Sequence, residues 1–535
     1  MSNTYDAIVI GAGVSGLYAS YCLRERGFSV RVFEAGSGVG GTWYWNRYPG
    51  ARFDSESYSY QYGFSKALFE EWQWSEQFAG QPEIERYLNF VAERFDLKRD
   101  IEFNARVASL HYDDDACEWT LTTADGRSAR ARYVVAAMGF LSAPQPPDYP
   151  GVGDFAGLTV HSARWPKEGI DFRGQRVGII GSGPTAVQII QSIAPEAGHL
   201  TVFQRTANWC TPLRNRKLNE AEQRELAAQA DEIVALCKRT FAGFIHDMDA
   251  RASTEVSSKA ERRAKYQELY DRGGFALWFA NYHDIFTNRA FAEEVSEFLA
   301  EKIRERVHDP DTAEKLIPKN HPYGTKRPPG ETNYYEAFNR DNVTLVDLRA
   351  TPVTRIVPQG VATSDALYEL DALIYATGFQ SLTGALLRVD IRGEDGLTLT
   401  EKWAEGPLTN LGVQIAGFPN LFITSGPHHP AVFCNATRCA ETAVDWIVEC
   451  IDHLRARGAT VIRTTPEAEA EWTQHCYDSV KGLIIDDMRD SWFFGNNNPE
   501  NKDEKRFLLW AGSVPTFHDT FADIARDGYR GFEIR

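Results

Sequence analysis

The chain has few cysteines, no long apolar run and no excess of positive charge, and each absence excludes a class of protein. None of its eight cysteines forms a C-x-x-C pair or a cluster with histidine at metal-ligand spacing. No apolar segment approaches the roughly 20 residues of a membrane-spanning helix. Acidic residues outnumber basic ones, 74 to 57, for a net charge of −17. We therefore expect no metal, no membrane anchor and no nucleic-acid-binding surface.

The cysteines are predicted to be ordinary thiols in a reducing cytoplasm. Cys434 and Cys439 have the C-x4-C spacing of some disulfide reductases, in which the pair closely follows the first nucleotide-binding unit. Because residues 23–116 contain no cysteine, we expect no redox role for this pair. The first predicted strand begins within five residues of Met1, which leaves no room for a leader segment and favours a cytoplasmic location.

The chain does contain two copies of a glycine-rich turn between an apolar strand and a helix. The first copy carries Gly11, Gly13 and Gly16, and the second carries Gly181, Gly183 and, in the third position, Ala186. Strand and helix on either side make this pattern typical of dinucleotide-binding units. Two such units predict two dinucleotides and electron transfer between them.

The residues that end the two units predict different ligands. Glu34 lies 23 residues after Gly11, where a carboxylate accepts hydrogen bonds from a ribose hydroxyl and repels a 2′-phosphate, as suits FAD or NAD. The corresponding residue after Gly181 is the neutral Gln204, followed by Arg205. An arginine offers a planar fork of donors to a phosphate, so the second unit is predicted to bind NADPH.

We predict an α/β fold with two Rossmann-like dinucleotide-binding domains and a helical insertion in the NADP domain. A proline-rich crossing near residues 142–150 separates the two domains. The composition turns helical from about residue 218, with helical apolar spacing over residues 220–237 and 291–307. The expected segments are FAD domain 1–142, NADP domain 143–217, helical insertion 218–329, NADP domain 330–379 and FAD domain 380–535.

Two further segments carry a resemblance to a known family. The motifs G-G-x-W and Y-P-G-x-x-x-D are matched at residues 40–43 and 48–54, and F-x-G-x-x-x-H-x-x-x-W-P is matched at residues 155–166. On these motifs the chain resembles the type I Baeyer–Villiger monooxygenases, which are class B flavin monooxygenases, and among them the phenylacetone monooxygenase group. The similarity extends over nearly the whole chain, through residues 203–206, 324–327, 338–342 and 491–492.

The resemblance implies an NADPH- and O2-dependent enzyme with noncovalent FAD that converts a ketone into an ester or lactone. Arg327 would stabilise the anionic flavin peroxide and the addition intermediate, with Asp54 orienting its guanidinium. Lys326, Arg205 and Thr206 would bind the NADP 2′-phosphate, and Trp492 would cover the nicotinamide ribose. Other predicted cofactor contacts are Ser15, Thr42, Trp43, Tyr60, Val107, Thr185, Gln188 and Ala436.

The remaining motif residues are assigned to a hinge and to the substrate space. The hinge set is Phe155, Gly157, His161, Trp165 and Pro166, in which we interpret His161 as a hydrogen-bonding link between domains rather than as a general base. His428, His429 and Phe433 lie in a segment that resembles the family's substrate-lining loop. The two histidines depart from the small residues common there, which leaves the preferred ketone open.

Two other functions remain open. One is an N- or S-oxygenating flavoprotein, against which the motif around His161 and the pair Lys326–Arg327 count. The other is a nucleotide-binding redox sensor or scaffold without turnover, against which both intact cofactor sites count. No obligate protein partner is indicated.

Overall fold

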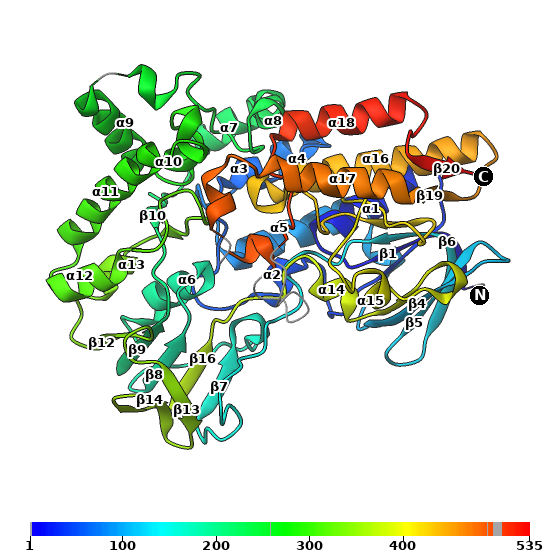
Figure 1. Cartoon of the computed structure of the whole chain (residues 1–535). Helices are drawn as coiled ribbons and strands as arrows, with labels where there is room; N and C mark the ends of the chain where they lie inside the picture. Colours follow the sequence, from blue (N-terminus) through cyan, green and yellow to red (C-terminus); the bar gives the residue numbers. More distant parts are fainter. Residues whose placement is uncertain (1–2, 257, 489–490, 496–505) are drawn as a thin grey trace.

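The computed structural model describes residues 3–256, 258–488, 491–495 and 506–535, and its two largest sheets consist mainly of parallel strands (Figure 1). The larger sheet has the order β17-β4-β5-β6-β1-β2-β3, with β18 also paired to β6. Its strands are β1 (Thr4–Ile10), β2 (Val30–Phe33), β3 (Ile101–Glu102), β4 (Val107–Asp113), β5 (Glu118–Thr123), β6 (Ser128–Ala136), β17 (Asp390–Arg392) and β18 (Leu421–Ile423). Strands from both ends of the chain therefore form one sheet.

Side-chain alternation explains why the centre of this sheet is buried on both faces. In β1, Ala7 and Val9 belong to one apolar core, whereas Ile8 and Ile10 belong to another on the opposite face. Successive strand residues point to opposite sides, so a continuous apolar run is the pattern of a sheet covered on both faces. Helix α1 (Val14–Glu25) covers the first face and packs against α16 (Ala436–Ala456).

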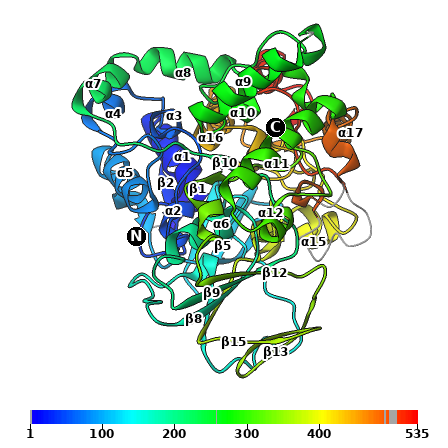
Figure 2. The same ribbon diagram turned by 90° about the vertical axis from the view of Figure 1, so that its left-hand side faces the viewer.

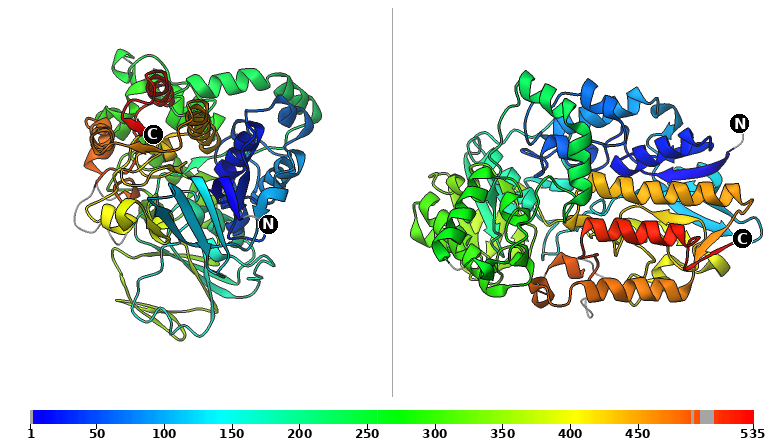
Figure 3. Two further views of the ribbon diagram at one scale, coloured as in Figure 1. Left: turned by 90° about the vertical axis from the view of Figure 1, so that its right-hand side faces the viewer. Right: turned by 90° about the horizontal axis from the view of Figure 1, so that it is seen from above.

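Several short helices follow β2, and long C-terminal helices complete the first unit. α16 and α18 run side by side in the view from above (Figure 3). The early helices are α2 (Thr42–Trp45), α3 (Ser57–Tyr60), α4 (Lys66–Glu71) and α5 (Gln81–Arg94). The late elements are α14 (Gly384–Leu387), α15 (Leu399–Lys402), α17 (Pro466–Ser479), α18 (Val514–Arg526) and the hairpin partners β19 (Ile462–Thr464) and β20 (Phe532–Ile534).

The smaller sheet is parallel throughout and has the order β12-β9-β8-β16-β7. Its strands are β7 (Leu158–His161), β8 (Arg176–Ile180), β9 (His199–Gln204), β12 (Val343–Asp347) and β16 (Ala372–Tyr375), and α6 (Pro184–Ile193) follows β8. An antiparallel sheet of β13 (Val353–Val357), β14 (Gly360–Thr363) and β15 (Leu367–Glu369) lies between β12 and β16 in the sequence.

A helical region lies above the smaller sheet and faces the viewer in Figure 2. Its helices are α7 (Glu220–Ala228), α8 (Ala230–Arg239), α9 (Lys259–Arg272), α10 (Ala276–Phe279), α11 (Arg289–Arg306) and α12 (Pro310–Leu316). The apolar spacing over 220–237 predicted one continuous helix, but the chain breaks at Gln229, whose backbone leaves helical geometry. The chain then passes through β11 (Gly330–Glu331), which pairs with β10 (Thr211–Pro212), and α13 (Tyr334–Ala337).

These pairings show where the chain crosses between the sheets. It leaves the larger sheet after β6, enters the smaller one at β7, and returns through β17 and β18. The boundaries of the five segments expected from the sequence remain predictions.

Candidate active site

The first glycine turn is a backbone cradle at the end of β1. Gly11 has a φ of +102°, and a Cβ added at Gly16 would collide with the Gly11 carbonyl oxygen. A Cβ at Gly13 would lie 3.2 Å from the Cα of Gly41, the second glycine of G-G-x-W. Because α1 begins directly after this turn, with Ser15 in its first turn, its free N–H groups favour a phosphate at the cradle.

Glu34 follows β2 beside this cradle and is only 4% exposed. Its two carboxylate oxygens accept hydrogen bonds from the backbone N–H groups of Ala12, at 2.7 Å, and Gly36, at 2.6 Å. Burial raises the pKa of Glu34, and the two backbone hydrogen bonds oppose that shift. The acceptor therefore lies beside the predicted phosphate cradle, where the ribose of a dinucleotide such as FAD would fit.

Predicted FAD contacts from three segments lie close to one another. The Trp43 indole donates to the Tyr60 hydroxyl at 3.0 Å, and the hydroxyl of Thr437, at the start of α16, donates to the Tyr60 carbonyl oxygen at 2.6 Å. Burial raises the pKa of Tyr60 to about 12, so its hydroxyl stays neutral. Ala436 is the first residue of α16; Thr42 is exposed at the start of α2, and Val107 begins β4.

The second glycine turn has the same construction at the end of β8. Gly181 has a φ of +134°, and nothing lies within 4 Å of a Cβ added at Gly183. Helix α6 begins directly after Gly183 and carries Thr185, Ala186 and Gln188. The open space at the helix start fits a second phosphate-bearing ligand.

Cationic groups collect where β9 ends, beside the second turn. Arg205 is exposed and Thr206 is half-buried. The Arg349 guanidinium donates to the Arg205 carbonyl oxygen at 2.8 Å and to the Thr206 hydroxyl at 3.2 Å. Burial, reinforced by the positive charges of Lys326 and Arg349, lowers the pKa of His321 to about 3. Lys326 therefore belongs to the same cationic region as Arg349.

Sequence reasoning missed Arg349, although a signal for it exists. β12 neighbours β9 in the smaller sheet; Arg349 follows the end of β12 by two residues, and Arg205 directly follows the end of β9. The carboxyl ends of parallel strands meet at one edge of a sheet, where ligands bind. A basic residue just past the next parallel strand was the available clue.

Asp54 and Arg327 form an ion pair although 273 residues separate them in the sequence. Nη1 of Arg327 lies 2.5 Å from Oδ2 of Asp54, and the two side chains are 29% and 4% exposed. The guanidinium also lies over the ring of Phe275, 5.0 Å from its centroid. A buried carboxylate thus fixes one edge of a partly exposed cation.

Gln188 links this ion pair to the second glycine unit. Its amide nitrogen donates to the Arg52 carbonyl oxygen at 3.0 Å and reaches Asp54 Oδ1 at 3.5 Å. The Tyr48 hydroxyl donates to the amide oxygen of Gln188 at 3.0 Å. Helix α6 begins at the second glycine turn, the predicted NADP cradle, and therefore connects that turn to the loop that carries Asp54.

His161 lies where the chain crosses between the two sheets, once after β6 and once after β16. The crossings pair with each other: the N–H of Gln145 donates to the Gly378 carbonyl oxygen at 2.9 Å. His161 Nδ1 accepts from the Ala163 N–H at 3.1 Å, so the ring proton is on Nε2, which donates to the Gln145 carbonyl oxygen at 3.1 Å. Burial lowers the pKa of His161 and keeps the ring neutral.

The other residues of this motif occupy different environments. Trp165 is buried against Phe172, whereas Pro166 and Phe155 are half-buried. Gly157 is exposed, but a Cβ there would contact the Asp371 carbonyl oxygen at 2.5 Å. The motif therefore combines a buried anchor, a close backbone contact and the crossing bond of His161.

Residues predicted to face the substrate divide into two groups. Phe433 contacts the rings of Trp278 and Phe493 at centroid distances of 6.4 and 5.5 Å, and Trp492 in turn contacts Phe493 at 4.9 Å. Trp278 lies 5.8 Å from Phe275, the ring beneath Arg327. An aromatic path therefore runs from Arg327 toward Phe433.

His428 and His429 are buried against the C-terminal helices. The His428 ring meets Tyr477 of α17, and the His429 ring meets Phe517 of α18, at centroid distances of 5.8 and 5.3 Å. Burial lowers the pKa of each to about 3. Their assignment to the substrate space remains a prediction.

The expectation of eight ordinary thiols is wrong at two positions. Cys434 and Cys439 are joined by a disulfide with a Cα–Cα distance of 6.3 Å. Asn435 caps α16, so the chain turns between Cys434 and the first turn of the helix and brings the two sulfurs together. The other six cysteines are free.

Within the part of the chain that the structure describes, no helix combines the length and apolar character needed to cross a membrane. The described residues also contain no group of three or more histidine, cysteine or acidic side chains arranged to hold a metal ion.

Comparison with solved structures identifies close relatives of the whole fold. The structure described as OTEMO in complex with FAD and NADP has a TM-score of 0.95, with 42% identity over 100% of both chains. A closed crystal structure of cyclohexanone monooxygenase has a TM-score of 0.96, with 41% identity over 100% of both chains.

Comparison with known sequences points in the same direction. A family described as pyridine nucleotide-disulphide oxidoreductase matches residues 8–275. The acetone monooxygenase (methyl acetate-forming) of Gordonia sp. (strain TY-5) is 45% identical over 100% of this chain and 99% of its own length. A Baeyer–Villiger monooxygenase of Pseudooceanicola batsensis is 39% identical over 98% and 95% of the two chains. The phenazine N-monooxygenase PhzNO1 of Lysobacter antibioticus is 38% identical over 99% and 96%.

The two glycine cradles, their different endings and these full-length similarities lead to one assignment. The chain belongs to the Baeyer–Villiger monooxygenases, flavoenzymes that use FAD and NADPH.

Proposed function

We propose that this enzyme oxidises small ketones to esters or lactones, with Arg327 as the catalytic cation and Asp54 as the residue that orients it. The observation that carries the proposal is the 2.5 Å ion pair between them, beside helix α6 of the NADP cradle. The proposal includes a cytoplasmic location, supported by six free cysteines against the two that form a disulfide, and action without an obligate protein partner.

When bound, FAD would supply the chemistry that activates O2, and NADPH would supply the hydride that reduces the flavin. The chain's own residues position both cofactors. Glu34 would accept hydrogen bonds from the FAD ribose, while Arg205, Thr206, Lys326 and Arg349 would hold the NADP 2′-phosphate by charge-assisted hydrogen bonds.

Arg327 stabilises the negative charge that develops on the reacting oxygen atoms. A guanidinium carries a permanent positive charge, so it stabilises negative charge without gaining or losing a proton. Asp54 holds Nη1, so the plane of the fork is set before the reaction begins and little reorganisation is needed. The Arg327 side chain is 29% exposed, so a ligand can reach it although Asp54 holds one of its nitrogens.

The substrate class follows from the relatives and from the aromatic path. The relatives are named for acetone and cyclohexanone, which are small and mostly apolar ketones. Phe275 lies beneath Arg327, and Trp278 and Phe433 continue the row of apolar rings from it, an environment that suits such substrates. A ketone whose carbonyl oxygen points toward Arg327 would place its alkyl groups along these rings.

N-oxygenation is the second candidate, because one full-length relative is named as a phenazine N-monooxygenase. That reaction requires an electrophilic oxygen rather than a nucleophilic one, so a fixed cation that stabilises negative charge favours ketone oxidation. The two candidates differ in product: an ester or lactone in one case and an N-oxide in the other.

A substrate panel tests the reaction class. Purified enzyme is incubated with NADPH, O2 and linear, cyclic, aromatic or steroid-like ketones, or with aromatic N-heterocycles, and products are quantified directly. We expect esters or lactones from small ketones. Product rather than NADPH loss must be measured, because uncoupled reduction of O2 also consumes NADPH. N-oxides without any ester would overturn the proposal in favour of the second candidate.

Substitution of Arg327 tests its role. We expect Arg327→Ala to lower ester formation at least about 100-fold, the usual effect of removing a preorganised charge-stabilising donor. NADPH-driven bleaching of the flavin should continue at nearly the wild-type rate. The control is Arg355→Ala, which removes an exposed arginine paired with Asp154. Ester formation retained in Arg327→Ala would remove Arg327 from the catalytic role.

A further inference from the structure

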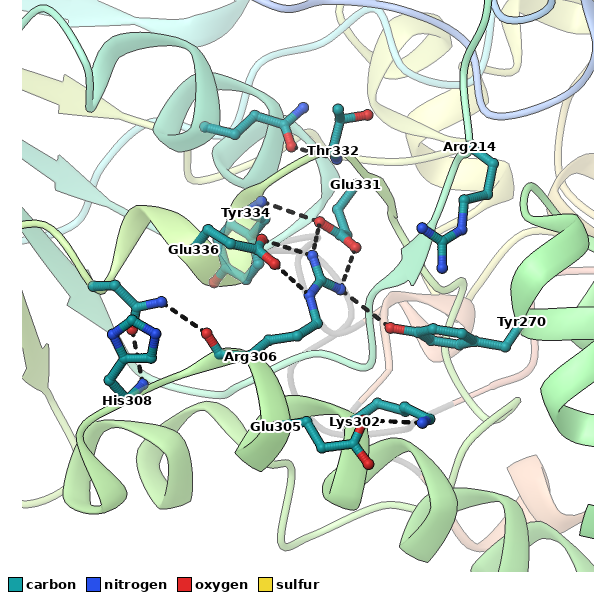
Figure 4. Close-up of polar contacts among 12 residues, drawn as sticks. Arg214, Tyr270, Lys302, Glu305, Arg306, His308, Glu331, Thr332, Tyr334 and Glu336 are labelled. Carbon is teal, nitrogen blue, oxygen red and sulfur yellow. Dashed lines mark hydrogen bonds and ion pairs between the residues drawn. The ribbon is translucent and has the colours of Figure 1, made fainter.

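The loop that carries Lys326 and Arg327 ends in a buried carboxylate. Glu331 closes this loop in β11, and its side chain is fully buried. Its two oxygens accept from Nη1 and Nη2 of Arg306 at 2.7 and 3.0 Å (Figure 4). Oε2 also accepts from the N–H of Tyr334 at 3.0 Å. The carboxylate is therefore held from two directions.

Arg306, the last residue of α11, has an acceptor for each of its five N–H groups. Nε and Nη2 donate to the two oxygens of Glu336, both at 2.7 Å, and the second proton of Nη1 faces the Tyr270 hydroxyl at 3.2 Å. Burial alone would lower the pKa of Arg306, but the hydrogen bonds to Glu336 and Glu331 outweigh it and raise that pKa. The guanidinium is permanently charged and geometrically fixed.

The backbone around Glu331 is also fixed, so the ion pair of Arg306 with Glu331, which we call the clamp, acts on the loop as a whole. β11 pairs with β10, and the N–H of Leu213 donates to the Glu331 carbonyl oxygen at 2.9 Å. The N–H of Thr332 donates to Gln191 of α6 at 2.8 Å. The segment that follows Arg327 is therefore attached to the insertion, to β10 and to the helix of the NADP cradle.

The anchored segment passes directly beside the proposed catalytic pair. A Cβ added at Gly330 would lie 3.2 Å from Oδ1 of Asp54. Glu331 is the fourth residue after Arg327, and four residues of extended chain reach at most about 14 Å. A shift of Glu331 would therefore move the peptide that sets the position of Arg327 against Asp54.

We propose that Arg306 and Glu331 are positioning residues whose ion pair fixes the loop that presents Arg327 to Asp54 and Lys326 to the NADP 2′-phosphate. The inference rests on the proposed role of Arg327. It assigns Arg306 no contact with substrate or cofactor. The competing role is a purely structural one, in which the ion pair only stabilises the junction of α11 and α13.

The helical region offers a matched control. Arg262 of α9 and Glu294 of α11 form a similar two-point ion pair, with hydrogen bonds of 3.2 and 2.7 Å. Both side chains are 18% exposed, and Glu294 also accepts from the Tyr266 hydroxyl at 3.2 Å. This pair joins the same helix α11 to its neighbour but has no connection to the Lys326–Arg327 loop through β11.

The experiment compares Glu331→Gln and Arg306→Lys with Glu294→Gln and Arg262→Lys. Glutamine keeps the shape of the carboxylate but loses its charge, and lysine keeps the charge but loses the fork. Hydrogen exchange is measured on peptides covering residues 324–332 without added NADPH. We expect at least a 10-fold faster exchange in the two clamp variants and no change there in the two control variants.

Two further measurements connect the loop to its function. In the clamp variants we expect the NADP+ dissociation constant to rise several-fold and the fraction of consumed NADPH recovered as ester to fall several-fold, with hydrogen peroxide taking its place. The control variants should keep wild-type values of both. If Glu331→Gln does not accumulate as folded protein, Arg306→Lys carries the test alone, because it leaves Glu331 paired with a cation.

The outcomes separate this inference from the proposed function. Unchanged exchange in residues 324–332, or equal changes in the clamp and control variants, would reduce the Arg306–Glu331 pair to a structural contact. Faster exchange of the loop with unchanged NADP+ affinity and unchanged ester yield would also overturn it. A wild-type enzyme that forms no ester would instead contradict the proposed function, while the exchange data would still report on the clamp.

Discussion

At the scale of single residues, the cationic region around Arg205 makes the sharpest prediction about cofactor choice. Arg205→Ala and Arg349→Ala should each raise the Michaelis constant for NADPH about 10-fold or more and leave that for NADH nearly unchanged. A charge-assisted hydrogen bond contributes about 1.5–3 kcal/mol, and only NADPH carries the 2′-phosphate that would receive it. Initial rates of flavin reduction at varied NADPH and NADH give both constants.

The two arginines can be separated by their contacts. Arg349 donates to the Thr206 hydroxyl and to the backbone of Arg205, so its loss should also displace those groups. We therefore expect the double variant to be less impaired than the product of the two single effects. Equal losses with NADPH and NADH would indicate a general distortion of the site and remove the 2′-phosphate argument.

At the scale of elements, we propose that His161 acts as a hinge, a role supported by the paired chain crossings between the two sheets. His161→Ala removes the donor to Gln145 and the acceptor for the Ala163 N–H. A neutral hydrogen bond contributes about 1 kcal/mol, so we expect turnover to fall several-fold. The affinity for NADP+, measured by equilibrium titration, should stay the same because His161 holds the linker and not the nucleotide.

The pH profile distinguishes a hinge from a general base. Burial lowers the pKa of His161 below its ordinary value of 6.5, so the ring is neutral both at that pH and above it. A hinge therefore predicts that wild-type and His161→Ala turnover change in parallel from pH 6.5 upward. A step in turnover over this range that disappears only in His161→Ala would assign the residue a proton-transfer role.

Local signals explain which elements the sequence could predict. The glycine turns, the strands before them and α16 follow from short-range patterns such as φ-permissive glycine, apolar runs and helical spacing. The break at Gln229 was missed because apolar spacing continues through it, and only the helix capping geometry ends α7. The disulfide between Cys434 and Cys439 was missed because the turn at Asn435 depends on the whole loop.

At the scale of the whole molecule, the site depends on contacts that no local pattern contains. Asp54 and Arg327 meet across 273 residues, and only the resemblance to a family connected them beforehand. Arg306 ends a helix and Glu331 lies in a two-residue strand, and no sequence motif marks either residue. Their ion pair could therefore be found only from the three-dimensional structure. Sequence therefore predicted the cofactors and the chemistry, whereas the support around Arg327 emerged from tertiary packing.

The buried histidines predict how the stability of the whole molecule depends on pH. His428 and His429 have folded-state pKa values of about 3, below the ordinary value of 6.5. Between these pH values the unfolded chain binds a proton at each histidine and the folded chain does not. Stability should therefore fall as the pH drops below 6.5, by about 1.4 kcal/mol per histidine for each pH unit, and should not change above 6.5 on their account.

The double variant His428→Asn/His429→Asn tests this dependence, because asparagine replaces the Nδ1 acceptor without adding a group that titrates in this range. We compare apparent thermal midpoints at one heating rate between pH 7.5 and 5.5, since a chain of this size need not unfold reversibly. The double variant should lose less stability on acidification than the wild type. The control His283→Asn, at an exposed position, should follow the wild type. Identical slopes in all three proteins would mean that other groups dominate acid destabilisation.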